Sequence, residues 1–301
     1  MTGRPLTPWL WSATMIAVVG LIAAGVVAFT ERGDAPPALI SEPVSPKASV
    51  GGEPLQIAGS GSNLPLTTLL VEAFRRTFPD VRVELHESIG SSGAFRATRD
   101  GAIDIGLVSR PARSGEEEGL RRIPYAATEA VFAVHPSVPD RTISKERLLN
   151  VYGGQRGYWN DGSVITVLQR EKGDSSHRAV EAEWPEFASV NEDAWKRERL
   201  RVIYSDQAMH QALIEVKGAM GLCDASALAI SKSPLVRLTV EGEGPFSKEF
   251  AFVVVPNPGD GVRRFLDFAL GERGREIVEE AGATPIPRAL DSDAGTFDGG
   301  S

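Results

Sequence analysis

The chain has 301 residues, a formal net charge of −8 and an apolar fraction of 42%. This composition is typical of globular proteins, and the length is sufficient for two lobes or domains. The acidic balance gives no support for nucleic-acid binding. Four histidines and one cysteine do not suggest a zinc site, and Cys223 has no partner for an intrachain disulfide.

An uncharged segment near the N-terminus, residues 8–30, consists mainly of Ala, Val, Ile, Leu, Trp and Gly. At ~1.5 Å per residue, a helix of this length can span the ~30 Å core of a bilayer. The segment is longer than the ~7–15-residue core of a cleaved signal peptide. We therefore expect residues 1–32 to be an uncleaved N-terminal anchor or a cleaved export signal. Either one places the rest of the chain in the periplasm or at the outer face of the cytoplasmic membrane.

Two further segments have the composition of unstructured chain. Residues 33–52 are rich in Pro, Gly, Ser and Ala and predict a flexible linker. Residues 291–301 predict a disordered tail. The folded part is therefore expected over residues 53–290.

The first part of this region alternates between strand and helix patterns. Residues 54–58, 81–85 and 103–108 predict strands, while apolar residues recur at helical spacing over residues 66–78 and 91–100. The order strand–helix–strand–helix–strand predicts an α/β fold with an open, largely parallel sheet.

The rest of the region mixes both patterns. It predicts strands at residues 128–135, 164–168, 218–223 and 249–255. It predicts helices at residues 142–152, 177–188, 192–199, 207–216, 261–270 and 272–281. Ser205 and Asp206 precede one of these helices and are expected to cap it.

Three polar turns fall at one edge of the predicted sheet, at residues 60–63, residues 88–93 and the pair Ser109–Arg110. In open α/β sheets, ligands lie outside the carboxyl ends of the strands. Glycine- and serine-rich turns at helix starts offer N–H groups and hydroxyls, which favour an anion. The candidate ligand residues in these turns are Ser62, Asn63, Gly90, Ser91, Ser109 and Arg110.

No serine in these turns has a histidine beside it in the sequence. Nucleophilic catalysis requires a base within reach of the nucleophile. We therefore expect a site that holds an anion without transforming it, and we expect no enzyme activity, metal or cofactor.

Several motifs resemble the phosphate-binding protein of bacterial ABC transporters and its PBP-like relatives. They are GSGSNLP at residues 59–65, SIGSSG at 88–93, GAIDIGLVSRP at 101–111, the segment VYGG to GDSS at 151–176, and GAMGLCD at 218–224. Each motif alone is weak. The GSSG turn combined with the D-x-G strand and the later W-N-D-G and R-x-x-G segments carries the resemblance.

The resemblance implies a two-lobed periplasmic-binding-protein fold of type II. It places two hinge strands near residues 132–136 and 250–256. Lobe one would comprise residues 53–134 and 251–290, and lobe two would comprise residues 135–250.

The resemblance also implies a set of ligand residues. Relatives of this family hold a desolvated oxyanion with backbone N–H groups, hydroxyls and one arginine. The matching positions are Asn63, Leu64, Ser91, Arg170, Asp174, Ser175 and Ser176.

Two positions depart from the family pattern. Ser109, followed by Arg110, stands where the phosphate binders commonly have an aspartate that accepts a proton from phosphate. Asp174 stands where their loop offers a serine. Either Asp174 has become the acceptor for a protonated phosphate, or Ser109 and Arg110 form a site for a different anion. A carboxylate repels a fully ionised anion, so an inward-pointing Asp174 favours a ligand that carries a proton.

These observations predict an extracytoplasmic solute-binding protein that captures an inorganic oxyanion, with phosphate as the first candidate, for an ABC transporter permease. The alternative is an envelope sensory or interaction protein that keeps the fold with altered or lost oxyanion binding. We expect a monomer that is attached to the membrane through its N-terminal helix and has no nucleic-acid partner.

Overall fold

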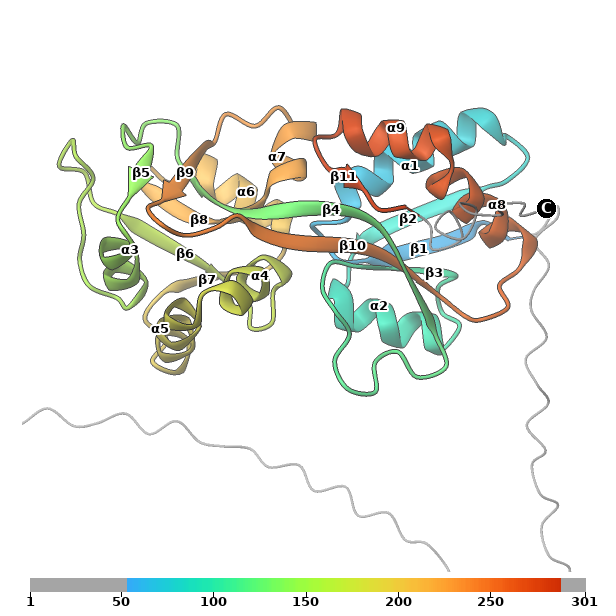
Figure 1. Cartoon of the computed structure of the whole chain (residues 1–301), viewed down its shortest axis with the longest axis horizontal. Coiled ribbons are helices and arrows are strands. Elements are labelled where there is room, and N and C mark those ends of the chain that lie inside the picture. The colour runs from blue at the N-terminus through green and yellow to red at the C-terminus, as the bar shows by residue number, and fades with distance from the viewer. Residues whose placement is uncertain (1–52, 288–301) are drawn as a thin grey trace, which may run out of the picture. The chain divides into compact units, whose positions relative to one another are not determined.

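A mixed sheet runs through residues 53–287, the part of the chain that the computed structural model describes. The strands are β1 (Leu55–Gly59), β2 (Val83–Ser88), β3 (Ile105–Val108), β4 (Arg121–Val134), β5 (Thr142–Ile143), β6 (Thr166–Arg170), β7 (Arg201–Ile203), β8 (Ala219–Asp224), β9 (Val236–Val240), β10 (Phe246–Val254) and β11 (Thr284–Pro285). The helices are α1 (Leu64–Thr77), α2 (Gly90–Arg99), α3 (Lys145–Tyr152), α4 (Ser175–Glu183), α5 (Pro185–Lys196), α6 (Asp206–Glu215), α7 (Ala225–Ile230), α8 (Asp260–Leu270) and α9 (Glu272–Glu280). The strand order along the main path is β2-β1-β3-β10-β4-β8-β6-β7, as Figure 1 shows.

The expected N-terminal anchor or signal, the linker and the tail lie outside the described residues. Between residues 53 and 287, no helix combines the length and the apolar character that a membrane crossing requires. The described residues all belong to one unit of the chain, Ser45–Ser301.

The first lobe confirms the predicted alternation of strands and helices. β1 pairs in parallel with β2 and β3, and the connections between these strands are α1 and α2. One face of the sheet packs against α1, α8 and α9, where the ring centroids of Phe74 and Phe265 lie 5.3 Å apart. The other face packs against Phe95 of α2. Each large apolar side chain buried in this way contributes about 1.5–3 kcal/mol to stability.

The second lobe has its own core. β6 pairs in parallel with β7 and β8, and β4 runs antiparallel to β8. Its core includes Tyr152, Trp184 and Phe187. The rings of Trp184 and Phe187 stack with their centroids 5.6 Å apart. The lobe therefore has a hydrophobic cluster independent of the first one.

The predicted helix at residues 177–188 is divided in the structure. α4 ends at Glu183 and α5 begins at Pro185, with Trp184 between them at φ −131° and ψ 88°. Proline disfavours the helical conformation for the residue before it, and it lacks the N–H that a continuous helix needs. The break allows Trp184 to turn into the core, where it is 1% exposed.

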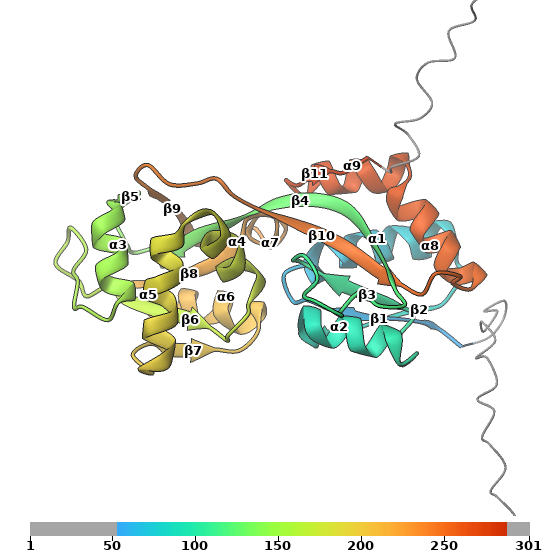
Figure 2. The same cartoon turned by 60° about the horizontal axis from the view of Figure 1, so that its bottom comes forward.

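Two long antiparallel strands, β4 and β10, connect the lobes, as Figures 1 and 2 show. On β4, the change from the first core to the second falls between Ala126 and Ala130. On β10, it falls between Phe246 and Phe250. The two crossing segments are therefore short, and Lys248 lies within one of them.

The crossing lies earlier on both strands than the expected hinge positions near residues 132–136 and 250–256. Phe132 and Val134 pack in the second core, whereas Phe252 packs in the first. β4 is buried throughout residues 130–134 and β10 throughout residues 250–254, so each has a continuous apolar run there. Such a pattern does not mark the point at which the strand passes from one core to the next.

Candidate functional site

A polar cleft of about 440 Å³ opens between the two lobes. The first lobe contributes the loop after β1, the start of α2 and the residues after β3. The second lobe contributes the loop from β6 to α4 and the turn before α6. Residues that line the cleft include Ser60, Gly61, Gly90, Ser91, Ser92, Arg96, Arg110, Arg113, Arg170, Glu171, Asp174, Ser175, Tyr204 and Asp206.

Serine hydroxyls join the two lobes in a layer, here called the cleft floor, of which Ser60 and Ser175 line the cleft and Ser62 and Ser109 do not. Ser62 Oγ lies 3.2 Å from Ser175 Oγ, although 113 residues separate them in the chain. Ser60 Oγ lies 3.3 Å from Ser62 Oγ and accepts a hydrogen bond of 2.9 Å from Ser109 Oγ. The structure therefore brings together serines that the sequence places in three separate turns.

Gly90 and Ser91 line the cleft at the start of α2, where the sequence predicts them. Gly90 has φ +69°, a left-handed conformation that glycine adopts without steric cost. Ser91 Oγ accepts a hydrogen bond of 3.3 Å from the Ser109 N–H. The N-cap residue Ile89 offers no side-chain acceptor to α2, and the Gly90 N–H donates to Ser88 Oγ at 3.4 Å.

Arg170, at the end of β6, is buried at the cleft and surrounded by carboxylates. Its Nη1 lies 3.2 Å from Asp174 Oδ2 and 3.0 Å from Asp206 Oδ1. Its Nε and Nη2 each donate to Glu171 at 2.8 Å. Burial opposes its charge, but these carboxylates, Asp174 first, raise the pKa of Arg170 above its ordinary value. Arg170 occupies the predicted place, and its charge is already balanced by the chain itself.

Asp174 caps α4 instead of facing the cleft as a free carboxylate. Its Oδ1 accepts hydrogen bonds from the N–H groups of Ser176, at 3.1 Å, and His177, at 3.0 Å. Burial opposes ionisation, but Arg170 and then His177 hold the pKa of Asp174 well below its usual range. An ionised carboxylate of the chain therefore binds N–H groups at the start of α4.

Asp206 is a member of the site that the sequence predicts only as a helix cap. The cap itself is formed by Ser205 Oγ, which accepts from the Ala208 N–H at 3.2 Å. Asp206 instead pairs with Arg170. Burial raises the pKa of Asp206, against the opposing effect of Arg170.

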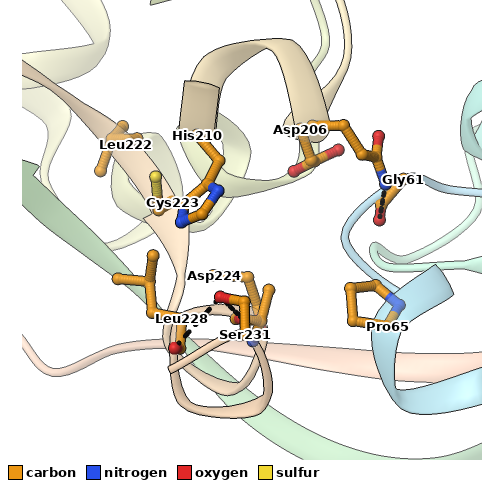
Figure 3. Close-up of a pocket in the computed structure, with 11 residues that line it drawn as sticks. Gly61, Pro65, Asp206, His210, Leu222, Cys223, Asp224, Leu228 and Ser231 are labelled. Atoms are coloured by element: carbon orange, nitrogen blue, oxygen red, sulfur yellow. Dashed lines mark hydrogen bonds between the residues drawn. The ribbon is translucent and has the colours of Figure 1, made fainter. Parts of the chain in front are cut away.

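Asp206 also lines a second, smaller cavity of about 140 Å³, which Figure 3 shows. Gly61 of the first lobe lies across this cavity from α6, and its carbonyl accepts a hydrogen bond of 3.3 Å from Gln207 Nε2. Cys223 and Asp224, from the end of β8, line the same cavity. This cavity is therefore distinct from the cleft but shares Gly61 and Asp206 with it.

Arg110 lines the cleft and forms a bidentate ion pair with Glu116. Arg110 Nη1 lies 2.7 Å from Glu116 Oε2, and Arg110 Nη2 lies 2.8 Å from Oε1. This hydrogen bonding lowers the pKa of Glu116 to about 2, although burial acts in the opposite direction. The predicted arginine is therefore present at the cleft as half of an ion pair.

Asn63 and Leu64, two of the predicted ligand residues, are not among the residues that line the cleft. The Asn63 side chain is fully buried in the first lobe, where Nδ2 donates to the Val108 carbonyl at 3.0 Å and Oδ1 accepts from Tyr125 Oη at 2.6 Å. Leu64 packs in the first core. The Asn63 amide thus satisfies buried polar groups of this lobe.

Lys248 is the main functional candidate that sequence reasoning missed. It is 6% exposed. Its Nζ donates to three serine hydroxyls, at 3.0 Å for Ser62, 3.0 Å for Ser175 and 3.1 Å for Ser176. Its charge partner is Asp224, whose Oδ2 lies 3.5 Å away. A lysine thus lies beneath the floor of the cleft and contacts both lobes.

A sequence signal for Lys248 does exist. Side chains alternate between the two faces of a strand, so Phe246, Lys248 and Phe250 share one face. Both phenylalanines are buried. A charged residue between two core positions of a strand is unusual, because buried lysines need a partner.

The donor set suits an oxyanion. Serine hydroxyls, helix N–H groups and guanidinium groups all form hydrogen bonds with negatively charged oxygen. Within residues 53–287, no cluster of three or more histidine, cysteine or acidic side chains is arranged to hold a metal ion.

A two-lobed α/β domain with a polar cleft between its lobes defines the periplasmic-binding-protein fold of type II. The sequence profile of the PBP superfamily domain matches residues 41–273. The chain therefore belongs to the PBP superfamily, a family of binding domains.

The individual proteins to which the chain is similar are more distant in sequence. Phosphate-binding protein PstS 2 of Streptococcus agalactiae is 28% identical over 116 residues, which cover 38% of this chain and 39% of the relative. Phosphate-binding protein PstS of Pseudomonas aeruginosa is 25% identical over 150 residues, which cover 47% of this chain and 45% of the relative. The matches thus span less than half the length of these curated relatives.

A solved structure of a protein from Clostridium perfringens, described as a phosphate ABC transporter substrate-binding protein with bound phosphate, superposes with a TM-score of 0.66. Its sequence identity is 22%, and the match covers 78% of this chain and 100% of that one. At this identity the likeness establishes the shared two-lobed fold.

Proposed function

We propose that this chain is an extracytoplasmic solute-binding protein that captures an inorganic oxyanion, with phosphate as the first candidate, and presents it to an ABC transporter permease. Two curated relatives are named phosphate-binding proteins, and the structural relative is described with bound phosphate. These names support phosphate as the first ligand to test.

The contact between Ser62 and Ser175 carries this proposal. The two hydroxyls come from different lobes and lie 3.2 Å apart; Ser175 lines the cleft, and Ser62 contacts Ser60, which also lines it. An anion bound beside them would receive hydrogen bonds from both lobes. Hydrogen bonds to a charged group contribute about 1.5–3 kcal/mol each. Four or five of them, less the cost of association, are consistent with micromolar affinity.

The acceptor groups at the cleft determine which protonation state of phosphate it would bind. Asp174 is ionised and already occupied by two N–H groups and by Arg170. It is therefore a poor acceptor for a phosphate proton. A serine hydroxyl both donates and accepts. The serines that line the cleft, such as Ser60 and Ser175, can thus accommodate either a protonated or a fully ionised oxygen, and we expect weaker discrimination against sulfate than an aspartate acceptor would give.

Isothermal titration of the full chain, freed of bound ligand by unfolding and refolding, tests the proposal. Phosphate, sulfate, arsenate and molybdate would be titrated at pH 6 and pH 8. Micromolar phosphate binding that weakens roughly ten- to a hundredfold in Arg170→Ala is the expected result. Arg178→Ala is the matched control, because Arg178 lies on the exposed side of α4, where its side chain is 48% exposed.

The second candidate function is an envelope sensory or interaction protein with lost oxyanion binding. The observation in its favour is the contact of Arg170 with three carboxylates of its own chain. Absence of heat and of thermal stabilisation with all four anions would favour this function and exclude the first.

A further inference from the structure

The position of Lys248 in the fold gives its side chain access to both lobes. It lies on β10 opposite Thr128 of β4, where both strands pass from one hydrophobic core to the other. Its ammonium group reaches Ser62 of the first lobe and Ser175 of the second. Few side chains outside such a crossing could contact both lobes in this way.

The chemistry of these contacts fixes the direction of the hydrogen bonds. An ammonium group has three donors and no acceptor. Lys248 directs its donors to three hydroxyls, so each hydroxyl oxygen must accept from it. The hydrogen of each hydroxyl must then point away from the lysine. One hydroxyl of the Ser62–Ser175 pair donates to the other, so Lys248 leaves Ser176 and one member of that pair with donors that can face another acceptor.

The cleft lies on the side toward which these donors can point. Ser175 lines the cleft directly, whereas Lys248 does not. Ser62 reaches the cleft through Ser60, a lining residue whose Oγ is 3.3 Å away. The cation thus lies behind a layer of hydroxyls that separates it from the cleft.

The charge partner of Lys248 is Asp224, at the end of β8. Asp224 Oδ2 is 3.5 Å from the ammonium, and Asp224 lines the second cavity shown in Figure 3. Asp224 Oδ1 is held at the start of α7 by the Ala227 N–H, at 3.1 Å. The positive end of the Lys248–Asp224 pair therefore contacts the serines, and the negative end lies at the second cavity.

We propose that Lys248 is a positioning residue of the anion site. It orients the hydroxyls of Ser62, Ser175 and Ser176 as donors and places a positive charge behind the cleft floor, so that the site binds dianions in preference to monoanions. This inference rests on the proposed oxyanion-binding function and names the residue that sets its charge preference.

Phosphate and sulfate titrations of the full chain test this inference. The test variant is Lys248→Met combined with Asp224→Asn, because the methionine alone would leave a buried carboxylate without its charge partner. Asparagine keeps an oxygen that can cap α7. Thermal unfolding checks that the double variant is folded, and Lys217→Met is the control for loss of an exposed lysine.

Phosphate carries mainly one charge at pH 6 and mainly two at pH 8, whereas sulfate is a dianion at both. In the double variant we expect affinity for phosphate at pH 8 and for sulfate at either pH to fall roughly ten- to a hundredfold. We expect a smaller loss for phosphate at pH 6. A residue with a merely structural role would weaken all of these affinities by the same factor.

The possible outcomes separate this inference from the function on which it depends. Equal affinity of the folded double variant and the wild type, or an equal loss at both pH values, overturns the role of Lys248 while the oxyanion function stands. No binding of either anion by the wild-type chain overturns the oxyanion function, and the inference with it.

Discussion

Arg170 and Asp206 form an ion pair of 3.0 Å between the end of β6 and the start of α6. The same guanidinium nitrogen also contacts Asp174 at 3.2 Å. Burial raises the pKa of Asp206, whereas Arg170, against the effect of burial, lowers the pKa of Asp174. Two carboxylates beside one arginine thus respond to their surroundings in opposite directions, and Asp206 is the one less favoured as an ion.

This arrangement predicts that Asp206→Asn strengthens anion binding. The substitution removes one negative charge from the cleft and leaves Arg170 paired with Asp174 and Glu171. We expect phosphate to bind roughly fivefold more tightly, or about 1 kcal/mol. Calorimetric titration at pH 7.5 measures the change. Glu118→Gln, which removes an exposed charge, is the control, and weaker binding in Asp206→Asn would contradict the prediction.

Glu116 predicts a specific pH dependence of stability. Its pKa is lowered from 4.5 to about 2 by the hydrogen bond from Arg110, so the folded state favours the ionised form. A carboxylate with a lowered pKa stabilises the fold above its unfolded pKa and loses that contribution as the pH falls through the folded pKa. The stabilisation is therefore complete above about pH 4.5 and is lost toward pH 2.

The corresponding test is Glu116→Gln. At pH 7 we expect the free energy of unfolding to fall by about 2–3 kcal/mol, and the difference from the wild type to shrink toward zero as the pH approaches 2. Urea unfolding at pH 7, 4.5 and 3 measures both effects. A difference that stays constant over this range would show that the ion pair is not its source.

Substitution of Gly59, the last residue of β1, is expected to have a large steric effect. It has φ +155°, and a Cβ at this position would lie 2.2 Å from the Leu107 carbonyl oxygen. Gly101, with φ +69°, has no atom within 4 Å of such a Cβ. Gly101→Ala should cost about 1–2 kcal/mol for the left-handed backbone alone. Gly59→Ala should cost distinctly more in urea unfolding, because β1 and β3 must separate; similar costs for the two variants would refute this.

Cys223 provides a probe of opening at the second cavity. It is 6% exposed, and burial raises the pKa of its thiol above the ordinary value. The thiolate is the reactive form. We expect an aromatic disulfide reagent at pH 8 to modify the native chain at least ~100-fold more slowly than the urea-unfolded chain. Comparable rates would show that α6 and α7 expose this region readily.

Much of the first lobe could be predicted from the sequence, because its strands and helices have clear and different periodicities. Gly90 and Ser91 follow a strand and begin a helix, which predicts their place at the cleft, whereas Ser175 is predicted only through the family resemblance. The family resemblance predicts Arg170 as a ligand residue, and the structure places its side chain at the cleft.

The ion-pair partners could not be predicted in the same way. Lys248 and Ser62 are 186 residues apart in the chain, and their contact depends on how two lobes pack. Asp206 looks like an ordinary residue at a helix start until its distance to Arg170 is known. The direction of the Asn63 side chain likewise depends on the buried groups around it, and local spacing carries no information about them.

The carboxylate at the start of α4 has a consequence for how the site would fill. Asp174 is tethered to the N–H groups that it contacts, so it is present there at a high effective concentration whatever the composition of the medium. An incoming anion that needs these groups must compete with a resident one. Such competition lowers affinity and speeds release. A receptor built in this way would fill when its solute is abundant and empty when it is scarce, and its occupancy would report supply over a higher concentration range than that of a high-affinity scavenger.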